Sequence, residues 1–129
     1  NFIAKYSAIS CEQLVLNISS GAGRNPVDGW NVYCSSKAGI DMFSRVLNVE
    51  SGINQSEIKV LSLAPGIMDT EMQDEIRTAN QSGFSNVNRF INYKKNGELS
   101  KPSTSARKVL RFILEKTLQQ EVVCSVRDL

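Results

Sequence analysis

Apolar residues along the chain fall into short runs and into longer stretches with helical spacing. Residues 13–18 and 59–64 form two short, mainly apolar runs, which are typical of buried parallel strands. Residues 122–126 predict a third short strand. Apolar positions at helical spacing predict helices over residues 32–50 and 103–117. Residues 67–100 are polar and irregular, and we expect short helices near residues 70–79 and 87–95.

Two of these predicted helices, residues 32–50 and residues 103–117, have an apolar face. Ser103 or Thr104 is expected to cap the start of the second helix, because a hydroxyl side chain can accept from a free amide of the first turn. The two faces consist of Ala38, Met42, Phe43, Val46 and Leu47, and of Ala106, Val109, Leu110, Ile113 and Leu114.

Strands alternate with helices along the chain, and this order predicts an α/β fold with a parallel sheet covered on its faces. A sheet of three strands would leave its first strand with an unprotected apolar edge. The chain also begins at Asn1, without Met, within a stretch of helical spacing around Phe2, Ile3 and Tyr6. We therefore expect further structure upstream of residue 1.

The bulk composition narrows the classes of partner. Hydrophobic residues make up 41% of the chain and charged residues 22%, and the net charge is +2, which together are ordinary for a globular protein. Basic and acidic residues are interspersed, so we expect neither nucleic acid nor a membrane surface as a partner. No apolar run approaches the length of a membrane span. Three irregularly spaced Cys fit reduced, small and buried thiols in a cytoplasmic protein.

The chain contains no His, which excludes several kinds of active site. Ser-His-Asp and Cys-His hydrolase centres need an imidazole, and so do zinc sites that are built on His. Three dispersed Cys do not supply a four-Cys zinc site, so no metal site is expected. Proton transfer must run through Tyr, Lys, Asp, Glu or Cys.

Polar and small residues follow the first two predicted strands. Ser19-Ser20 comes after residues 13–18, and residues 65–70 (PGIMDT) come after residues 59–64. Ligands of open α/β sheets bind at the carboxyl ends of the strands. Tyr33 and Lys37 open the intervening helix at positions i and i+4, which share a face. The sequence thus predicts that both side chains point into the crevice that Ser20 borders.

Ser20, Tyr33 and Lys37 are the residue types that a carbonyl reduction needs. An ammonium close to a phenol favours the phenolate, so Tyr33 can exchange its proton closer to neutral pH. The phenol gives this proton to a carbonyl oxygen as hydride reaches the carbon. Ser20 can hydrogen-bond the same oxygen and orient it. Each feature alone has an ordinary structural explanation, and the prediction depends on their combination and order.

Three short motifs together resemble those of the short-chain dehydrogenase/reductase family. Residues 17–20 (NISS) resemble its NxSS motif, residues 33–37 (YCSSK) its YxxxK motif, and residues 65–66 its Pro-Gly motif. Ser20 precedes Tyr33 by 13 residues, the usual interval in the family, which selects Ser20 over Ser19. Residues 61–72 (LSLAPGIMDTEM) look most like the branch of sepiapterin reductase and benzil reductase.

The resemblance implies a Rossmann-like, doubly wound parallel sheet and a role for each matching residue. Tyr33 would be the general acid, Ser20 the carbonyl anchor, and Lys37 the residue that assists Tyr33 and holds the nicotinamide ribose. Trp30 is either a wall of the substrate pocket or a packing residue. The residues after Met72 would form a lid over the substrate. The implied cofactor contacts are Tyr33, Lys37, Pro65, Gly66, Ile67 and Thr70, and the implied substrate contacts are Ser20, Trp30, Gly66 and Met72.

The sequence departs from the family pattern in two respects. The glycine-rich phosphate loop of the family is missing, so residues 1–129 are expected to be the carboxyl-terminal part of a single reductase domain. Cys124 stands where sepiapterin reductases have an Asp that anchors the pterin, which favours a benzil-reductase-like activity. The branch implies NADPH, although NADH is not excluded, and the family implies a homodimer or homotetramer of the intact protein.

Three functions are consistent with these observations. The first is NADPH-dependent reduction of a small ketone or vicinal dicarbonyl to the alcohol. The second is a truncated or degenerate homologue that serves as a non-catalytic binding or assembly module, which the missing phosphate loop favours. The third is epimerase or dehydratase chemistry, against which the lack of extra substrate-domain length counts.

Overall fold

Three parallel strands form the centre of the fold in the computed structural model, which describes residues 2–6, 9, 11–115 and 121–128. The sheet order is β1-β2-β3, so β1 lies at an edge, as the sequence predicts. The strands are β1 Leu14–Ile18, β2 Lys59–Ala64 and β3 Val123–Ser125. The helices are α1 Phe2–Tyr6, α2 Asn31–Ile53, α3 Glu71–Thr78, α4 Val87–Lys95 and α5 Pro102–Leu114, with short 3-10 turns η1 Gly21–Gly23 and η2 Val126–Asp128.

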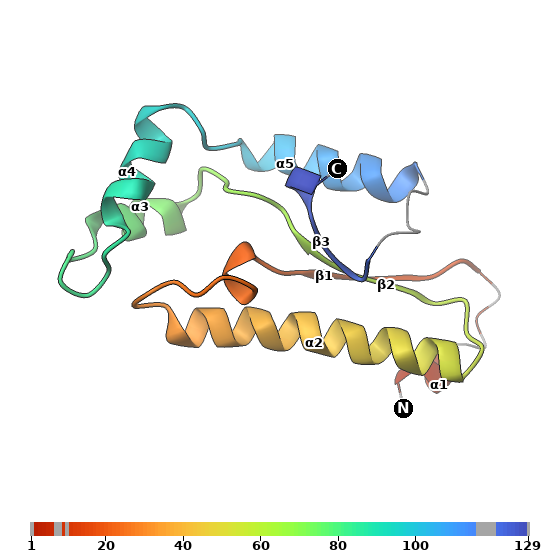
Figure 1. Cartoon of the computed structure of the whole chain (residues 1–129). Helices are drawn as coiled ribbons and strands as arrows, with labels where there is room; N and C mark the ends of the chain where they lie inside the picture. Colours follow the sequence, from red (N-terminus) through yellow and green to blue (C-terminus); the bar gives the residue numbers. More distant parts are fainter. Residues whose placement is uncertain (1, 7–8, 10, 116–120, 129) are drawn as a thin grey trace.

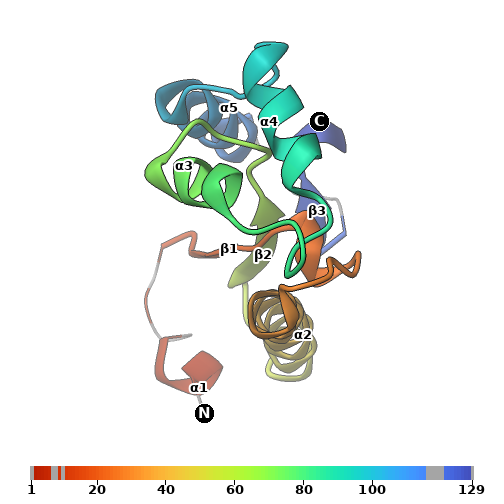
Figure 2. The ribbon, with the colours of Figure 1, turned by 90° about the vertical axis from the view of Figure 1, so that its left-hand side faces the viewer.

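The sheet lies between α2 on one face and α5 on the other (Figures 1 and 2). All five residues of β1 pair in parallel with β2, from Leu14 opposite Lys59 to Ile18 opposite Leu63. The shorter β3 pairs with the second half of β2. Strand β2 is buried from Val60 to Ala64 because it has a strand on each side and a helix over each face. The predicted α/β architecture is confirmed.

Helix α2 packs on the sheet through a mainly polar surface, contrary to the apolar face expected from the sequence. Its buried residues are Asp41, Ser44, Leu47 and Ser51. Ser62 of β2 donates to Asp41 over 2.7 Å. Of the expected face, Leu47 is buried, whereas Met42 is 60% exposed, and Ala38, Phe43 and Val46 are also exposed. Hydrogen-bond partners on the strands therefore decide which side of α2 faces the sheet, and periodicity alone does not reveal them.

Helix α5 packs through apolar side chains, but its buried face is rotated from the one expected. Ser105, Val109 and Phe112 are buried, whereas Leu110 is 58% exposed and Leu114 is 76% exposed. Val109 and Phe112 belong to a core cluster with residues of β2 and β3, namely Leu61, Leu63 and Cys124.

The start of α5 also differs from the prediction. The N-cap residue is Lys101, and Pro102 occupies the first turn, where its missing amide hydrogen costs no helical hydrogen bond. Ser103 and Thr104 therefore lie inside the helix rather than at its cap. The expected end of this helix at residue 117 lies outside the described residues.

Helices α3 and α4 lie together at the end of the molecule where α2 begins (Figures 1 and 2). They have a small core of their own, built from Ile76, Phe84 and Val87. Val27 and Trp30, from the loop before α2, pack against that core. This contact joins the segment after β2 to the amino-terminal end of α2.

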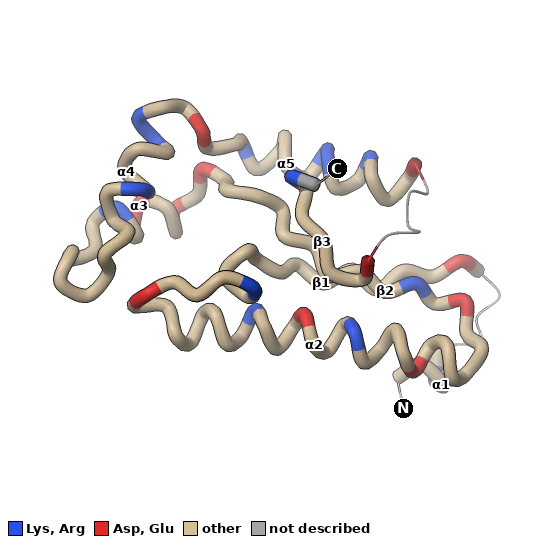
Figure 3. The backbone as a smooth tube through the Cα atoms, in the orientation of Figure 1, with Lys and Arg blue, Asp and Glu red and all other residues tan. Residues whose placement is uncertain are grey.

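Charged positions of both signs are interspersed along the backbone (Figure 3). Within the part of the chain that the structure describes, no helix is both long and apolar enough to cross a membrane. Cys124 is buried as expected, but Cys11 is exposed and Cys34 is intermediate, so the expectation of buried thiols is right for one of the three.

Candidate functional site

The carboxyl ends of β1 and β2 form the edge of the sheet at which the predicted site residues gather. The amide of Ser19, just beyond β1, donates to the carbonyl oxygen of Leu63 over 2.9 Å. This bond extends the strand pairing by one step, so the segment with Ser20 and the segment that begins at Pro65 leave the sheet side by side. The two polar loops singled out in the sequence therefore border one edge.

Tyr33 and Lys37 lie one turn apart at the amino-terminal end of α2. The Lys37 ammonium is 5.7 Å from the centre of the Tyr33 ring. It also donates to the carbonyl oxygen of Ile18, the last residue of β1, over 2.9 Å. The expected proximity of the two side chains to each other and to this edge is observed. Their catalytic role stays a prediction.

The η1 turn holds Ser20 next to α2. Ser20 caps the turn, and its hydroxyl accepts from the amide of Ala22 at 3.2 Å. Gly23 of the same turn lies so close to α2 that a Cβ atom would be 2.8 Å from the carbonyl carbon of Lys37. Any larger residue would thus push the turn away from the helix. The small-residue loop fixes the distance between the Ser20 segment and the Lys37 backbone.

The second loop connects β2 to α3 and is held by backbone hydrogen bonds. The amide of Ser100 donates to the carbonyl oxygen of Ile67 over 3.0 Å, and the amide of Asp69 donates to the carbonyl oxygen of Ser100 over 2.9 Å. Thr70 is the N-cap residue of α3, and Met72 on that helix is 44% exposed. The predicted cofactor and substrate contacts of this loop therefore lie between the sheet edge and the α3–α4 unit.

Trp30 connects the predicted catalytic helix to the α3–α4 unit. Its ring stacks on Phe84 at 5.2 Å with an interplanar angle of 11°, and it meets Tyr33 edge-on at 5.3 Å. Phe90 of α4 completes the group, at 5.4 Å from Trp30. Trp30 is thus a packing residue on one side and a neighbour of Tyr33 on another. Its role as a wall of the substrate pocket stays a prediction.

Asp28 makes contacts that no local pattern in the sequence indicates. Its carboxylate accepts from the amide of Ser85 at 2.7 Å, from the Ser85 hydroxyl at 2.9 Å and from the Asn86 amide at 2.8 Å. These donors, first of all the Ser85 amide, hold the pKa of Asp28 below its ordinary value. A sequence separation of 57 residues hides this contact from any local pattern.

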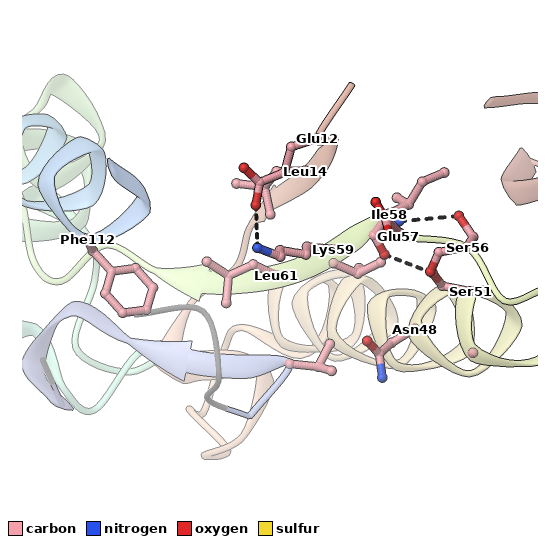
Figure 4. Close-up of a pocket in the computed structure, with 13 residues that line it drawn as sticks. Glu12, Leu14, Asn48, Ser51, Ser56, Glu57, Ile58, Lys59, Leu61 and Phe112 are labelled. Carbon is pink, nitrogen blue, oxygen red and sulfur yellow. Dashed lines mark hydrogen bonds and ion pairs between the residues drawn. The ribbon is translucent and has the colours of Figure 1, made fainter. Parts of the chain in front are cut away.

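Two hollows differ in their relation to this edge. The larger, of about 680 Å³, lies at the amino ends of β1 and β2 beside the Glu12–Lys59 ion pair (Figure 4). It contains none of the predicted site residues. The smaller, of about 420 Å³, lies beside Trp30, Ile76 and Phe84. Because the candidate chemistry lies at the carboxyl edge, we assign the site there and not to the larger hollow.

Comparisons with known proteins identify the family of this chain. The short chain dehydrogenase family matches residues 12–81. Benzil reductase ((S)-benzoin forming) of Bacillus subtilis is 36% identical over 127 residues, which cover 98% of this chain and 52% of the relative. Sepiapterin reductase of Meriones unguiculatus is 39% identical over 105 residues, covering 81% and 38% respectively.

A solved structure of the same family also has a similar fold. A short-chain dehydrogenase/reductase of Saccharomyces cerevisiae superposes with a TM-score of 0.76 at 28% identity, covering 89% of this chain and 46% of that one. The chain thus spans about half the length of the curated relatives it matches.

Proposed function

Since the chain belongs to the short-chain dehydrogenase family, we propose that it supplies the catalytic, carboxyl-terminal half of a Rossmann-like carbonyl reductase. The reaction is the reduction of a small ketone or vicinal dicarbonyl to the alcohol, with NADPH as the hydride source. The observation that carries the proposal is the pairing of Tyr33 and Lys37 on α2, at the edge of the sheet that Ser20 borders. The Lys37 ammonium lies 5.7 Å from the centre of the Tyr33 ring.

The groups at this edge fit a nicotinamide cofactor. Lys37 has an ammonium with three donors, one of which reaches the Ile18 carbonyl oxygen, so further donors are available for ribose hydroxyls. Tyr33 and Lys37 would hold the ribose, and the loop with Pro65, Gly66, Ile67 and Thr70 would line the nicotinamide. The bound cofactor would supply a hydride to the carbonyl carbon.

The residues of the chain handle the proton and the orientation of the substrate. Ser20 donates a hydrogen bond to the carbonyl oxygen and fixes its direction. Tyr33 donates its phenolic proton to the same oxygen, which thereby becomes the hydroxyl of the alcohol. Lys37, one turn further along α2, would assist Tyr33 in this role. Trp30 and Met72 border the substrate on the side of α3.

The substrate class is argued from the relatives and from one residue. Benzil reductases and sepiapterin reductases are both among the relatives, and their names indicate a ketone or dicarbonyl substrate. Cys124 is buried in the core cluster of β2, β3 and α5 and offers no carboxylate for a pterin. This favours benzil-reductase-like activity over sepiapterin reduction.

Replacement of Tyr33 by Phe tests the proposal. Tyr33→Phe removes one hydroxyl, and we expect turnover of benzil with NADPH to fall about 10²–10⁴-fold, the usual contribution of a general acid. Tyr6→Phe is the matched control, because it removes the same hydroxyl at the other end of the molecule, on α1. Equal turnover by the two variants of the intact protein would contradict the assignment.

A non-catalytic assembly module is the second candidate, and the outward surface of α2 is consistent with it. Val32, Met42, Phe43, Val49 and Ile53 are all more than half exposed on that helix. Titration of the chain with NADPH, followed by nicotinamide fluorescence, separates the two functions. Micromolar binding supports the reductase, whereas a lack of binding by the intact protein supports the module.

The same surface supports assembly of the reductase itself. We expect the intact protein to be a homodimer or homotetramer in which this side of α2 is buried, because apolar area of this extent is normally covered. Sedimentation analysis would detect the oligomer, and a monomer at micromolar concentration would contradict the expectation.

A further inference from the structure

We propose that Asp28 is a positioning residue for the site. It ties helices α3 and α4, which we take as the lid expected after Met72, to helix α2, which carries Tyr33, and so sets the affinity of the closed site for substrate. The inference depends on the proposed reductase function for its kinetic consequence. Its structural part, the coupling of the lid to Trp30, stands by itself. Three consecutive residues, Asp28, Gly29 and Trp30, form the tie, which we call the strap.

Asp28 makes the polar contact of the strap. Its two carboxylate oxygens accept three hydrogen bonds from Ser85 and Asn86, at 2.7 to 2.9 Å. Ser85 and Asn86 lie immediately before α4, in the turn that joins the two lid helices. Hydrogen bonds to an ionised acceptor are about twice as strong as neutral ones. The loop before α2 is therefore bonded to the tip of the lid.

Gly29 makes the close contact of the strap. Its φ angle is +73°, and a Cβ atom placed on it would be 2.5 Å from the carbonyl oxygen of Gly83. A side chain at this position would both strain the backbone and separate the two loops. Glycine is thus required at position 29 for the lid to approach this closely.

Trp30 contacts both the lid and Tyr33, the candidate general acid, so it couples the position of the lid to that of Tyr33. Its ring stacks on Phe84 of the lid and touches the edge of Tyr33, which is three residues further along the chain. Trp30 is also the N-cap residue of α2. A lid that moves away removes Phe84 from this stack, and Trp30 then loses the contact that holds it beside Tyr33. The strap therefore sets how often Trp30 is held in this position.

Trp30 is the single Trp of the chain, so its fluorescence reports on the strap directly. We expect Asp28→Ala to raise the acrylamide quenching constant of Trp30 about twofold, because the loop opens locally without global unfolding. Asp28→Asn keeps one accepting oxygen and should give an intermediate value. Asp74→Asn is the matched control, since Asp74 lies on the same lid but pairs with Arg77 of its own helix.

A steric variant tests the strap by a second route. Gly29→Ala should raise the quenching of Trp30 as Asp28→Ala does, because it drives the two loops apart. Gly83→Ala is its control, because a Cβ atom there would meet its nearest neighbour, the Asn80 carbonyl oxygen, at an ordinary 3.8 Å. Far-UV circular dichroism identifies any variant that has unfolded.

The kinetic consequence is measured in the intact protein with benzil and NADPH. If Asp28→Ala lowers the closed fraction of the lid tenfold, KM for benzil rises about tenfold while kcat changes less than about twofold. Asp28→Asn should recover part of the lost affinity. Quenching and KM values equal to those of the Asp74→Asn control would overturn the proposal.

A failure of the proposed reductase function would look different. In that case the unmodified intact protein would not turn over benzil, whereas the quenching series would still decide whether the strap exists. Normal quenching in Asp28→Ala together with normal turnover in the parent would overturn the strap alone.

Discussion

Helices α2 and α5 cover opposite faces of the same sheet by different means (Figure 2). Helix α2 is fixed partly by three hydrogen bonds: Lys37 donates to Ile18, Ser62 donates to Asp41, and Asn17 donates to Ser44. Its one buried apolar residue, Leu47, packs in a cluster with Ile58 and Val60. Helix α5 is fixed by the burial of Val109 and Phe112 against the other face. Hydrogen bonds are directional, whereas apolar burial scales with area and tolerates small shifts.

The difference matches the tasks that we propose for the two helices. A helix that presents Tyr33 and Lys37 to a substrate must not slide or rotate, because small misplacements cost rate. Hydrogen bonds that join Lys37, Asp41 and Ser44, on successive turns of α2, to β1 and β2 fix the position of the helix along its axis and its rotation about that axis. Helix α5 carries none of the predicted site residues, so its packing need only supply stability. Contact chemistry therefore distinguishes the positioning helix from the supporting one.

The largest effect on stability is expected from Phe112→Ala, which removes the main apolar contact of α5. A buried Phe replaced by Ala typically costs about 3–5 kcal/mol through lost burial and the remaining cavity. Urea unfolding measures this loss in the free energy of unfolding, with the exposed Leu114→Ala as control, expected within about 0.5 kcal/mol of the parent. A similar loss in both variants would mean that α5 does not support the sheet in this way.

Ser62→Ala is expected to cost less stability than Phe112→Ala but to displace α2 more, because it removes the hydrogen bond to Asp41. Asp41 is 6% exposed, and its second carboxylate oxygen has no hydrogen-bond partner among the described residues, so losing Ser62 leaves the whole carboxylate unpaired. An unsatisfied buried group costs about 1–3 kcal/mol. We also expect kcat to fall in the intact protein, because Tyr33 and Lys37 move when α2 shifts. Lower stability with an unchanged kcat would refute a positioning role for this contact.

The smallest effect is expected from acid. The pKa of Asp28 is lowered in the folded chain, so its contacts stabilise fully above the unfolded value and are lost as the pH falls through the lower folded value. Below pH ~4, the ordinary range of an Asp, Trp30 quenching should begin to rise. The apolar contacts of α5 carry no charge and should not respond. The rise should be absent from Asp28→Asn, and its persistence there would assign it to another group.

The sequence alone determined the elements and the order of the chemistry. The range predicted for β2 matches the structure in full, as does that of α4, because apolar runs and helical spacing are local properties of the chain. Tyr33 and Lys37 share a face for the same reason, since four residues make about one helical turn. The motifs at the strand ends then indicated the family, which the comparisons show.

Only the tertiary structure decided which surfaces meet. The sequence predicted that Met42, Phe43 and Val46 share one apolar face of α2, but the partners of Asp41 and Ser44 on the strands turn these three residues outward. Likewise, nothing near Asp28 in the sequence indicates its contact with Ser85, which the fold brings to it. A hydrogen bond between distant segments forms only if the fold places both segments side by side. The hydropathy pattern of one segment does not indicate the position of the other.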